Sequence, residues 1–428
     1  MNTGFDRDAQ EFARGATAIV VLPDMGGSAR DADARLEETA GLALAIGVEV
    51  RHRVPFRVRA PKPATLIGSG QVDQLMAVVR DEDIQLAVFD AALTPVQQRN
   101  LETALGCKVI DRTGLILEIF GERARTAEGR LQVELAHLDY QAGRLVRSWT
   151  HLERQRGGFG FLGGPGETQI EADRRLIRDR MARLRRELEG VSRTRTLHRD
   201  RRQRAPWPVV ALVGYTNAGK STLFNRLTGA DVMAENLLFA TLDPTLRQVS
   251  LPGIDKAILS DTVGFVSDLP TQLVAAFKAT LEEVVSADLL IHVRDVAHPD
   301  TVVQAADVEA VLAEIGVDET TPRIEAWNKL DLLDDDDRTE MLGEAAHRDD
   351  VVALSALTGE GVERLVRTVG DRLTQGHRRY RIALAPEDGA SAAWLHAHGE
   401  VTDHWIDEDR ALYDVRMAPA DYDRFLTR

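Results

Sequence analysis

The chain of 428 residues contains one cysteine, Cys107. A single cysteine cannot form an internal disulfide, which excludes the class of secreted domains held together by disulfides. Its apolar neighbours, LGCKVI, predict an inert core thiol. No stretch reaches the roughly 20 consecutive apolar residues that span a bilayer, and the N-terminal MNTGFDRDAQEF lacks the features of a secretory signal. We therefore expect a cytoplasmic protein with no membrane partner.

Lysine is absent from residues 123–204, although this segment holds 20 arginines against 11 aspartates and glutamates, a net charge of +9. The whole chain has a formal net charge of −15, so the remainder carries −24. The acidic remainder argues against a general affinity for nucleic acid, whereas the basic segment is suited to contact phosphate groups. A solvated coiled coil, kept soluble by its charges, is an alternative explanation of this segment.

A chain of this length exceeds one hydrophobic core, so several domains are expected. In residues 1–111, short apolar runs (ATAIVVL, ATLIG, IQLAVFD, KVI) alternate with helical patterns, which predicts a small α/β domain. In residues 112–204, apolar side chains recur every three or four positions from Leu131 to Leu152 and from Ile177 to Val191. This spacing predicts an antiparallel helical hairpin with a glycine-rich tip at 155–167 (QRGGFGFLGGPGE), followed by an arginine-rich linker, RTRTLHRDRRQR.

The second half of the chain contains two further patterns. Residues 205–375 begin with WPVVALVG and continue as alternating apolar strands and helices of ordinary length. Residues 376–428 contain YRIALA, the helical GASAAWLHAHG, LYDVRM and DYDRFL, which together predict a small α+β domain.

Two weaker patterns admit a ligand site as well as a structural explanation. GSGQVDQL, residues 68–75, follows an expected strand and opens a helix, where a loop can touch an anion, but a plain turn and helix start explains it too. His396, His398 and His404 lie close together, yet no cysteine or fourth histidine accompanies them, and metal binding needs a convergent geometry. We expect these histidines to be surface or core residues.

GYTNAGKS, residues Gly214 to Ser221, follows the strand-like VVALV and precedes the helix-like STLFNRL. This order matches the phosphate-binding pattern G-x-x-x-x-G-K-[ST]. Glycines allow backbone N–H groups to surround phosphates, Lys220 reaches the outer phosphate oxygens, and the Ser221 hydroxyl can ligate Mg²⁺. We therefore expect a nucleotide site at this loop.

Three further motifs point to a guanine nucleotide. DTVG (261–264) follows the strand AILS, where the carboxylate can support Mg²⁺ through water and the Gly264 N–H can sense the terminal phosphate. In NKLD (328–331), Asp331 can accept two hydrogen bonds from guanine that adenine cannot supply. Ser355 and Ala356 of VVALSALTGEG are expected to close the base pocket through backbone contacts.

Between the first two motifs lies FATLDPT, the expected position of a first switch loop. Thr241 and Thr245 are both candidates for completing the Mg²⁺ shell, and Thr241 is preferred. Phe265 follows Gly264 where Ras-like switches have a glutamine that orients water, so a partner or another element must supply this function. Asn217 resembles an asparagine with which some GTPases hold K⁺ beside the phosphates, and shaping the loop is its alternative role.

These motifs define the expected site and fold class. The expected catalytic residues are Lys220, Asn217 and Gly264; Ser221 and Thr241 are expected to hold Mg²⁺, and K⁺ is a candidate second cation. The expected contacts to GTP or GDP are Gly214, Tyr215, Thr216, Asn217, Ala218, Gly219, Lys220, Ser221, Thr222, Phe239, Ala240, Thr241, Leu242, Asp243, Asp261, Thr262, Val263, Gly264, Asn328, Lys329, Leu330, Asp331, Ser355, Ala356 and Leu357. The fold class is multi-domain α/β: an N-terminal α/β domain with a long helical hairpin, a Ras-like P-loop G domain with a mixed, mostly parallel sheet and helices on both faces, and a small C-terminal α+β domain.

Longer stretches carry a family resemblance. DRTGLILEIFGERARTAEGRLQVELAHLDYQAGRLVRSWTHLERQRGG, GPGETQIEADRRL, GYTNAGKSTLFNRLTGA, FATLDPTLR and LSDTVGFVSDLP closely resemble the HflX family of ribosome-associated GTPases. The hairpin segment makes this resemblance specific, because it is peculiar to that family while the GTP motifs are shared by many. Where the family usually has an arginine immediately before Gly-Pro-Gly-Glu, this chain has a glycine.

The resemblance implies a ribosome-stimulated GTP hydrolase, monomeric and cytoplasmic, that is partly associated with ribosomes. The N-terminal domain and hairpin are expected to bind the large subunit near the peptidyl transferase centre, and GTP-bound members split or rescue stalled ribosomes. Expected rRNA contacts are Arg156, Phe159, Phe161, Arg174 and Arg175, with a side-chain-poor tip entering a narrow RNA cleft. Capping of the hairpin's apolar seam is the alternative role of the two phenylalanines. Two alternatives stay open: a GTP-dependent switch that acts on a protein partner without RNA, and an ATP-dependent RNA helicase acting through the N-terminal domain.

Overall fold

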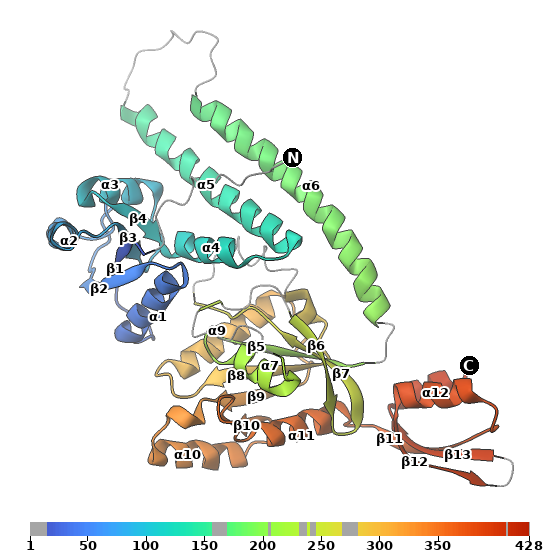
Figure 1. Cartoon of the computed structure of the whole chain (residues 1–428). Coiled ribbons are helices and arrows are strands. Elements are labelled where there is room, and N and C mark those ends of the chain that lie inside the picture. The colour runs from blue at the N-terminus through green and yellow to red at the C-terminus, as the bar shows by residue number, and fades with distance from the viewer. Residues whose placement is uncertain are drawn as a thin grey trace.

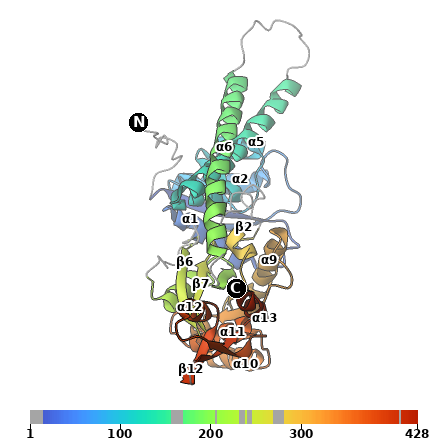
Figure 2. The same ribbon diagram turned by 90° about the vertical axis from the view of Figure 1, so that its right-hand side faces the viewer.

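A computed structural model of the chain describes residues 15–155, 169–203, 207–230, 238–239, 245–267, 281–407 and 410–427, with side chains except at 145–155, 169–173, 192–203 and 420. Figure 1 shows an N-terminal sheet domain beside a larger sheet domain, a pair of long helices, and a small domain at the C-terminal end. In Figure 2 the helix pair projects beyond both sheet domains. Within the described ranges no helix combines the length and apolar character needed to cross a membrane.

The N-terminal domain is built on a parallel four-stranded sheet in the order β2-β1-β3-β4. Alternate residues of β1 face two different apolar cores, with Val20 on one side and Ile19 and Val21 on the other. Because helices cover both faces, the sequence of β1 is an unbroken apolar run. The elements are β1 (Thr17–Asp24), α1 (Ala32–Ala45), β2 (Glu49–Arg57), α2 (Ser69–Asp81), β3 (Leu86–Phe89), α3 (Pro95–Leu105), β4 (Lys108–Asp111) and α4 (Arg112–Arg123).

One predicted strand of this domain, ATLIG, is wrong. Residues 64–68 form a turn in which Leu66 has a φ of +65° and makes an isolated bridge to Lys62. The strand beside β1 is instead EVRHRVPFR, at the edge of the sheet. Exposed charged residues alternate with covered ones along this edge strand, and that mixture hides its strand character in the sequence.

The loop before α2 is a helix cap. Gln71 Oε1 accepts a hydrogen bond of 2.9 Å from the Gly68 N–H, and its amide donates to the carbonyl of Arg57 at 3.2 Å. GSGQVDQL therefore follows a turn rather than a strand, and the structural explanation of its glycines applies.

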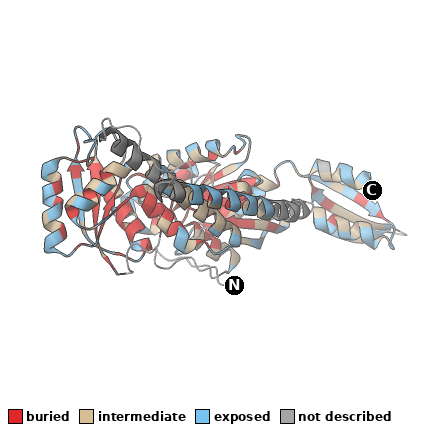
Figure 3. Ribbon diagram, turned by 90° about the horizontal axis from the view of Figure 1, so that it is seen from above, coloured by how far each residue is buried: buried red, intermediate tan, exposed pale blue. Residues whose placement is uncertain are grey.

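The two predicted long helices are α5 (Ala127–Gln155) and α6 (Gln169–Gln203), which contact one another. On α6, Met181 and Leu184 of the predicted apolar series are buried. Among the described side chains of α5, Val133 and Ala136 are buried and pack into the N-terminal core with α4, whereas the predicted Leu131 is half-buried. The α5 helix thus lies between α4 and α6, and its apolar positions serve two neighbours. Figure 3 shows that the described side chains of α6 are largely exposed.

The arginine-rich stretch is not the linker that we predicted, because its residues 193–203 form the last part of α6. Arginine, leucine and glutamine all favour helix, and the first proline after them is Pro206, so nothing interrupts the helix earlier. The glycine-rich tip beyond Gln155, with Arg156, Phe159 and Phe161, lies outside the described residues.

The larger domain has a six-stranded sheet in the order β10-β9-β8-β5-β7-β6, in which only the β6–β7 pairing is antiparallel. This confirms the predicted mixed, mostly parallel sheet. The carboxyl ends of its parallel strands meet at one edge, where open α/β sheets bind ligands. The elements are β5 (Val209–Gly214), α7 (Lys220–Thr228), β6 (Thr245–Leu251), β7 (Ile254–Asp261), β8 (Leu289–Asp295), α9 (Thr301–Glu314), β9 (Arg323–Asn328), the 3₁₀ helix η2 (Leu330–Leu332), α10 (Asp335–Ala346), β10 (Val351–Ala353) and α11 (Val362–Leu373).

The C-terminal domain is the predicted small α+β unit. Its antiparallel sheet has the order β11-β13-β12 and packs on two helices. Each histidine of HAHGEVTDH has an aromatic neighbour: His398 stacks on Trp394, and His396 and His404 lie against Tyr413. The elements are β11 (Arg378–Leu384), α12 (Gly389–His398), β12 (Glu400–Asp407), β13 (Arg410–Met417) and α13 (Pro419–Leu426).

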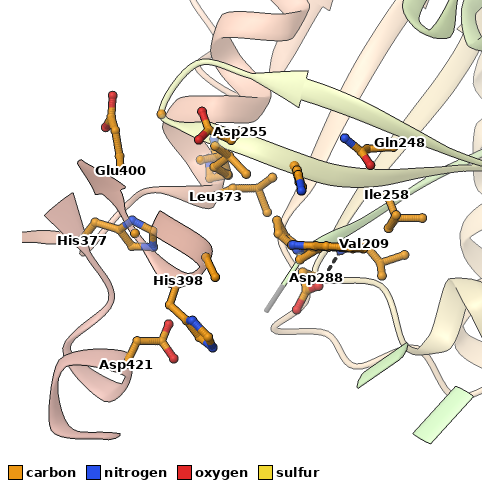
Figure 4. A pocket seen from close by; sticks show the side chains of 18 of the residues that line it. Val209, Gln248, Asp255, Ile258, Asp288, Leu373, His377, His398, Glu400 and Asp421 are labelled. Atoms are coloured by element: carbon orange, nitrogen blue, oxygen red, sulfur yellow. Dashed lines mark hydrogen bonds between the residues drawn. The ribbon is translucent and has the colours of Figure 1, made fainter. Parts of the chain in front are cut away.

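A cleft of about 1110 Å³ separates the C-terminal domain from the six-stranded sheet. Figure 4 shows His377, Glu400 and Asp421 on one side of it and Asp255 and Asp288 on the other. Of the predicted nucleotide contacts that the structure describes, none lines this cleft. The nucleotide motifs gather instead at the carboxyl edge of the six-stranded sheet.

Candidate nucleotide-binding site

The loop between β5 and α7 requires glycine at both ends. Gly214 has a φ of +149°, and a Cβ there would lie 2.2 Å from the carbonyl oxygen of Val293. Gly219 has a φ of +96°, and a Cβ there would lie 2.2 Å from Asn328 Nδ2. Any side chain at either position would force neighbouring strands or loops apart, so this close approach is possible only with glycine.

Lys220 is the first residue of α7, and its ammonium group turns back over the loop. Nζ donates hydrogen bonds to the carbonyls of Gly214 at 3.0 Å and Tyr215 at 2.7 Å. The residue is buried, and burial lowers the pKa of Lys220 to about 8, against the opposing effect of the Asp261 carboxylate. A buried ammonium group held in this way is well placed to attract an anion.

Ser221, the next residue, joins the loop to the end of β7. Its Oγ donates to Asp261 Oδ2 at 2.8 Å, and Asp261 is fully buried. A hydroxyl and a carboxylate at the start of a helix are hard oxygen donors of the kind that Mg²⁺ prefers. These two residues therefore fit the predicted magnesium ion.

The segment after Asp261 is bound directly to the loop. Thr216 N–H donates to the carbonyl of Phe265 at 2.7 Å, and Phe265 N–H donates to the carbonyl of Gly214 at 3.1 Å. At Gly264 an added Cβ would lie 2.8 Å from Thr216 Cα and 3.0 Å from Lys220 Nζ. Gly264 thus sits in close contact with the loop, and only glycine fits there.

The Phe265 side chain is turned away from the nucleotide loop. It is 2% exposed and belongs to the apolar core that the N-terminal domain shares with the six-stranded sheet. A ring in this position cannot order a water molecule. The structure therefore agrees with the expectation that Phe265 does not act as the Ras-like glutamine does.

Asn328 connects the phosphate loop with the two motifs expected to bind the base. Its Nδ2 donates to the carbonyl of Ala218 at 2.7 Å, and its Oδ1 accepts the N–H of Ala356 at 2.8 Å. Close by, Ser355 Oγ donates to Asp331. One buried amide therefore joins the phosphate loop, the NKLD segment and the loop Ser355-Ala356-Leu357 (the SAL loop), although these lie far apart in the sequence.

The other predicted nucleotide contacts differ in their surroundings: some are exposed, and one lies in an apolar core. Asn217 is exposed at the apex of the loop with a φ of +60°, and Leu357 is 69% exposed. Phe239 lies edge to face on Phe120 of α4, with a centroid distance of 4.7 Å, inside the shared core. The switch residues Ala240, Thr241, Leu242 and Asp243 lie outside the described part of the chain.

Of the predicted RNA contacts, Arg174 and Arg175 lie on α6. Arg174 is partly buried and Arg175 is exposed. Both belong to the projecting helix pair rather than to the nucleotide site (Figure 1).

Sequence reasoning missed several residues around the loop. Arg226 of α7 donates to the carbonyls of Ala356 and Leu357 and so holds the SAL loop from below. Glu38 and Arg112 of the N-terminal domain reach Tyr215 and the segment after Phe265. No short motif marks these residues. Arg112 lies in DRTGLILEIFGERA, part of the stretch that resembles the HflX family, and this resemblance was the one sequence feature that pointed to it.

Comparison with known proteins extends over nearly the whole chain. Four family descriptions match: "GTP-binding GTPase N-terminal" over residues 33–121, "GTP-binding GTPase Middle Region" over 123–202, "50S ribosome-binding GTPase" over 209–329 and "HflX C-terminal domain" over 340–427. A solved GTP-binding protein from Sulfolobus solfataricus in complex with GDP is 25% identical, with a TM-score of 0.46 over 84% of this chain and 99% of that one.

Curated relatives are more similar. The GTPase HflX of Magnetococcus marinus is 52% identical over 392 residues, which is 91% of this chain and 90% of the relative. The GTPase HflX of Escherichia coli K12 is 44% identical over 394 residues, 91% of each chain. With this degree of identity over nine tenths of its length, and with the guanine-nucleotide motifs joined at one edge of a mostly parallel sheet, the chain belongs to the HflX family of GTP-hydrolysing proteins.

Proposed function

We propose that this protein uses its GTPase cycle to bind the large ribosomal subunit and to split or rescue stalled ribosomes. The observation that carries the proposal is the combination, in one chain, of a nucleotide site at the carboxyl edge of the six-stranded sheet and an arginine-rich helix pair that projects away from it (Figure 2). The match to the "50S ribosome-binding GTPase" description supports the ribosomal target.

Within the site, we assign the phosphates to the loop from Gly214 to Ser221 and the base to Asp331. Lys220 carries its positive charge to the outer phosphates, and Gly264 senses the terminal phosphate through its backbone N–H. Asp331 accepts two guanine N–H groups while the Ser355 hydroxyl keeps its carboxylate in position.

Ser221 and Thr241 would hold Mg²⁺, with Asp261 supporting it through water. When bound, the ion neutralises charge on the phosphate oxygens. Two of these oxygen donors are already close together: the 2.8 Å hydrogen bond between Ser221 and Asp261 brings both to the start of α7.

Hydrolysis requires a substitute for the glutamine that Phe265 replaces. We propose that the ribosome supplies or orders it, and that a K⁺ ion beside Asn217 assists. The exposed position of Asn217 next to the expected phosphates supports this role. The test compares turnover in KCl with turnover in NaCl, for the wild type and for Asn217→Ala. Equal rates in both salts, or an unchanged K⁺ preference in the variant, would contradict the K⁺ assignment.

RNA contact is assigned to the helix pair and its tip. Arg174 and Arg175 would meet phosphate groups, and Arg156, Phe159 and Phe161 would carry the tip into an rRNA cleft, where aromatic rings can stack on exposed bases. Because the tip lacks the arginine usual in the family, its affinity should depend more on shape and stacking than on charge.

The decisive experiment is co-sedimentation of the full chain with ribosomes in GDP or a non-hydrolysable GTP analogue. A second protein with residues 157–166 shortened provides the comparison, and both are measured at about 50 and 200 mM salt, where phosphate contacts weaken steeply. We expect analogue-dependent binding that weakens with salt and with the shortened tip. Binding that ignores both the nucleotide and the tip would contradict the proposal, and analogue-dependent binding to a protein partner without RNA would replace it.

A further inference from the structure

The N-terminal domain contacts the phosphate loop directly. The Tyr215 hydroxyl, on the second residue of that loop, donates to Glu38 of α1 at 2.8 Å and accepts the Ser267 N–H at 2.8 Å. Tyr215 is 4% exposed. Its ring therefore points away from the nucleotide and into the seam between the two domains.

Ser267, three residues after Gly264, is bound by the same domain. Its carbonyl accepts from Arg112 Nη2 at 3.2 Å, and its Oγ lies 3.2 Å from the same nitrogen and also accepts from Arg30. Ser267 is buried. Two guanidinium groups from the N-terminal domain thus hold the chain immediately after the DTVG motif.

The charged side chains in this seam form ion pairs between arginines and carboxylates. Arg112 pairs with Glu38 and, at 2.6 Å, with Asp90, and all three side chains are at most 6% exposed. Burial alone would raise the pKa values of Glu38 and Asp90. Arg112, together with Arg30 at Glu38 and Arg35 at Asp90, holds both pKa values below their usual range. A second contact, from Asp31 N–H to Asp300 at 3.0 Å, fixes the start of α1 on the larger domain. The network is therefore built from paired groups that are costly to separate.

This seam sets where Gly264 lies. On one side, Phe265 is hydrogen-bonded by its backbone to Gly214 and Thr216 of the loop; on the other side, Ser267 is bound by Tyr215, Arg112 and Arg30. Gly264 lies between the β7 strand and these anchors, so its backbone has little room to move. It is close to Lys220: a Cβ added at Gly264 would lie 3.0 Å from Lys220 Nζ.

We propose that Tyr215 and Ser267 are positioning residues through which the docked N-terminal domain holds Gly264 against the phosphate loop, and that this contact disfavours GTP relative to GDP. A terminal phosphate beside Lys220 needs the space next to Gly264, so the segment must move outward to admit it. The seam opposes that movement, whereas GDP does not require it. The inference rests on the proposed role of Gly264 as the sensor of the terminal phosphate.

The experiment uses the full chain with Tyr215→Phe, which removes the hydroxyl and keeps the ring. Affinities for fluorescent GDP and for a fluorescent non-hydrolysable GTP analogue are measured by titration. We expect the affinity ratio of analogue to GDP to rise by about fivefold or more, the lower end of usual coupling between sites. Tyr380→Phe, in the C-terminal domain, removes a hydroxyl from another tyrosine and should leave the ratio unchanged.

A second variant, Ser267→Ala, removes the hydroxyl that accepts from Arg112 and Arg30. It tests whether both hydroxyls change the affinity ratio through one contact. If both hydroxyls act through the same contact, the double variant changes the ratio by less than the product of the two single changes. By reciprocity, the GTP analogue must also loosen the seam, so hydrogen exchange at the Ser267 and Asp31 amides should be faster with the analogue than with GDP.

The outcomes distinguish this inference from the proposed site. If the wild type binds both nucleotides but Tyr215→Phe and Ser267→Ala keep its affinity ratio, the positioning role is wrong and the site stands. If the wild type binds neither nucleotide, the proposed site is wrong and this inference falls with it. A raised ratio in both variants with unchanged melting temperature supports the positioning role.

Discussion

Asn328 and Ala218 lie 110 residues apart in the chain, and the Asn328 side-chain amide donates a hydrogen bond of 2.7 Å to the Ala218 carbonyl. The same side chain accepts the Ala356 N–H. We expect Asn328→Ala to weaken GDP and GTP binding alike by roughly 10- to 100-fold, because two buried backbone groups lose their partner at about 1–3 kcal/mol. Titration with fluorescent nucleotides checks this. A loss confined to GTP would contradict the assignment, since Asn328 bonds Ala218 and Ala356 rather than Lys220 or Gly264, the groups assigned to the terminal phosphate.

Asp331 should decide which base binds. In Asp331→Asn the side chain gains a donor, which matches the C2 carbonyl of xanthine instead of the guanine amine. We expect GTP affinity to fall by at least about 100-fold and xanthosine triphosphate to bind better than GTP. Competition between the two nucleotides measures the change. Ser355→Ala is the control: it removes the partner of the carboxylate and should weaken GTP without creating xanthine preference.

The lowered pKa of Lys220 predicts how nucleotide affinity depends on pH. Burial lowers its pKa to about 8 in the free protein, and a bound phosphate favours the ammonium form, so binding raises the pKa. GTP affinity should therefore be level below about pH 7 and fall above pH 8, approaching tenfold per pH unit. Titration calorimetry in buffers of different ionisation enthalpy should show about half a proton taken up per GTP at pH 8. No proton uptake at this pH would contradict the prediction.

Arg112 should contribute strongly to stability. Arg112→Ala removes the shared partner of the buried Glu38 and Asp90 and leaves them Arg30 and Arg35 alone, which costs about 3 kcal/mol near neutral pH. Both carboxyl groups have folded pKa values below their ordinary 4.5 and 3.8, so their ionised state adds stability above those values, and this is lost as the pH falls through the lowered values. The deficit of the variant should accordingly shrink in acid.

Urea unfolding of the full chain at pH 7 and pH 3 measures this difference. Arg348→Ala is a matched control, because Arg348 also pairs with two carboxylates but its side chain is 38% exposed. Its loss should cost no more than about 1 kcal/mol. Equal deficits for the two variants would show that the buried seam adds nothing beyond a surface ion pair.

Much of the fold followed from local patterns. The apolar run of β1, the strand, glycine loop and helix around Lys220, and the long helical periodicity of α6 each depend on residues close in sequence, so they could be predicted. Where local patterns misled, tertiary context explains it: β2 is an edge strand with only half of its side chains covered, and the arginine-rich end of α6 has no helix breaker before Pro206.

The sequence by itself determined the chemistry of the nucleotide site, because glycine, lysine and aspartate at fixed spacings have few other uses in that order. Only the tertiary structure decided what surrounds that chemistry. The Tyr215 ring turns toward Glu38, the Phe239 ring lies on Phe120, and Arg112 reaches Ser267, contacts between residues more than a hundred positions apart. Such pairings depend on how two domains dock, and docking is a property of matched surfaces and buried charge, which no local spacing encodes.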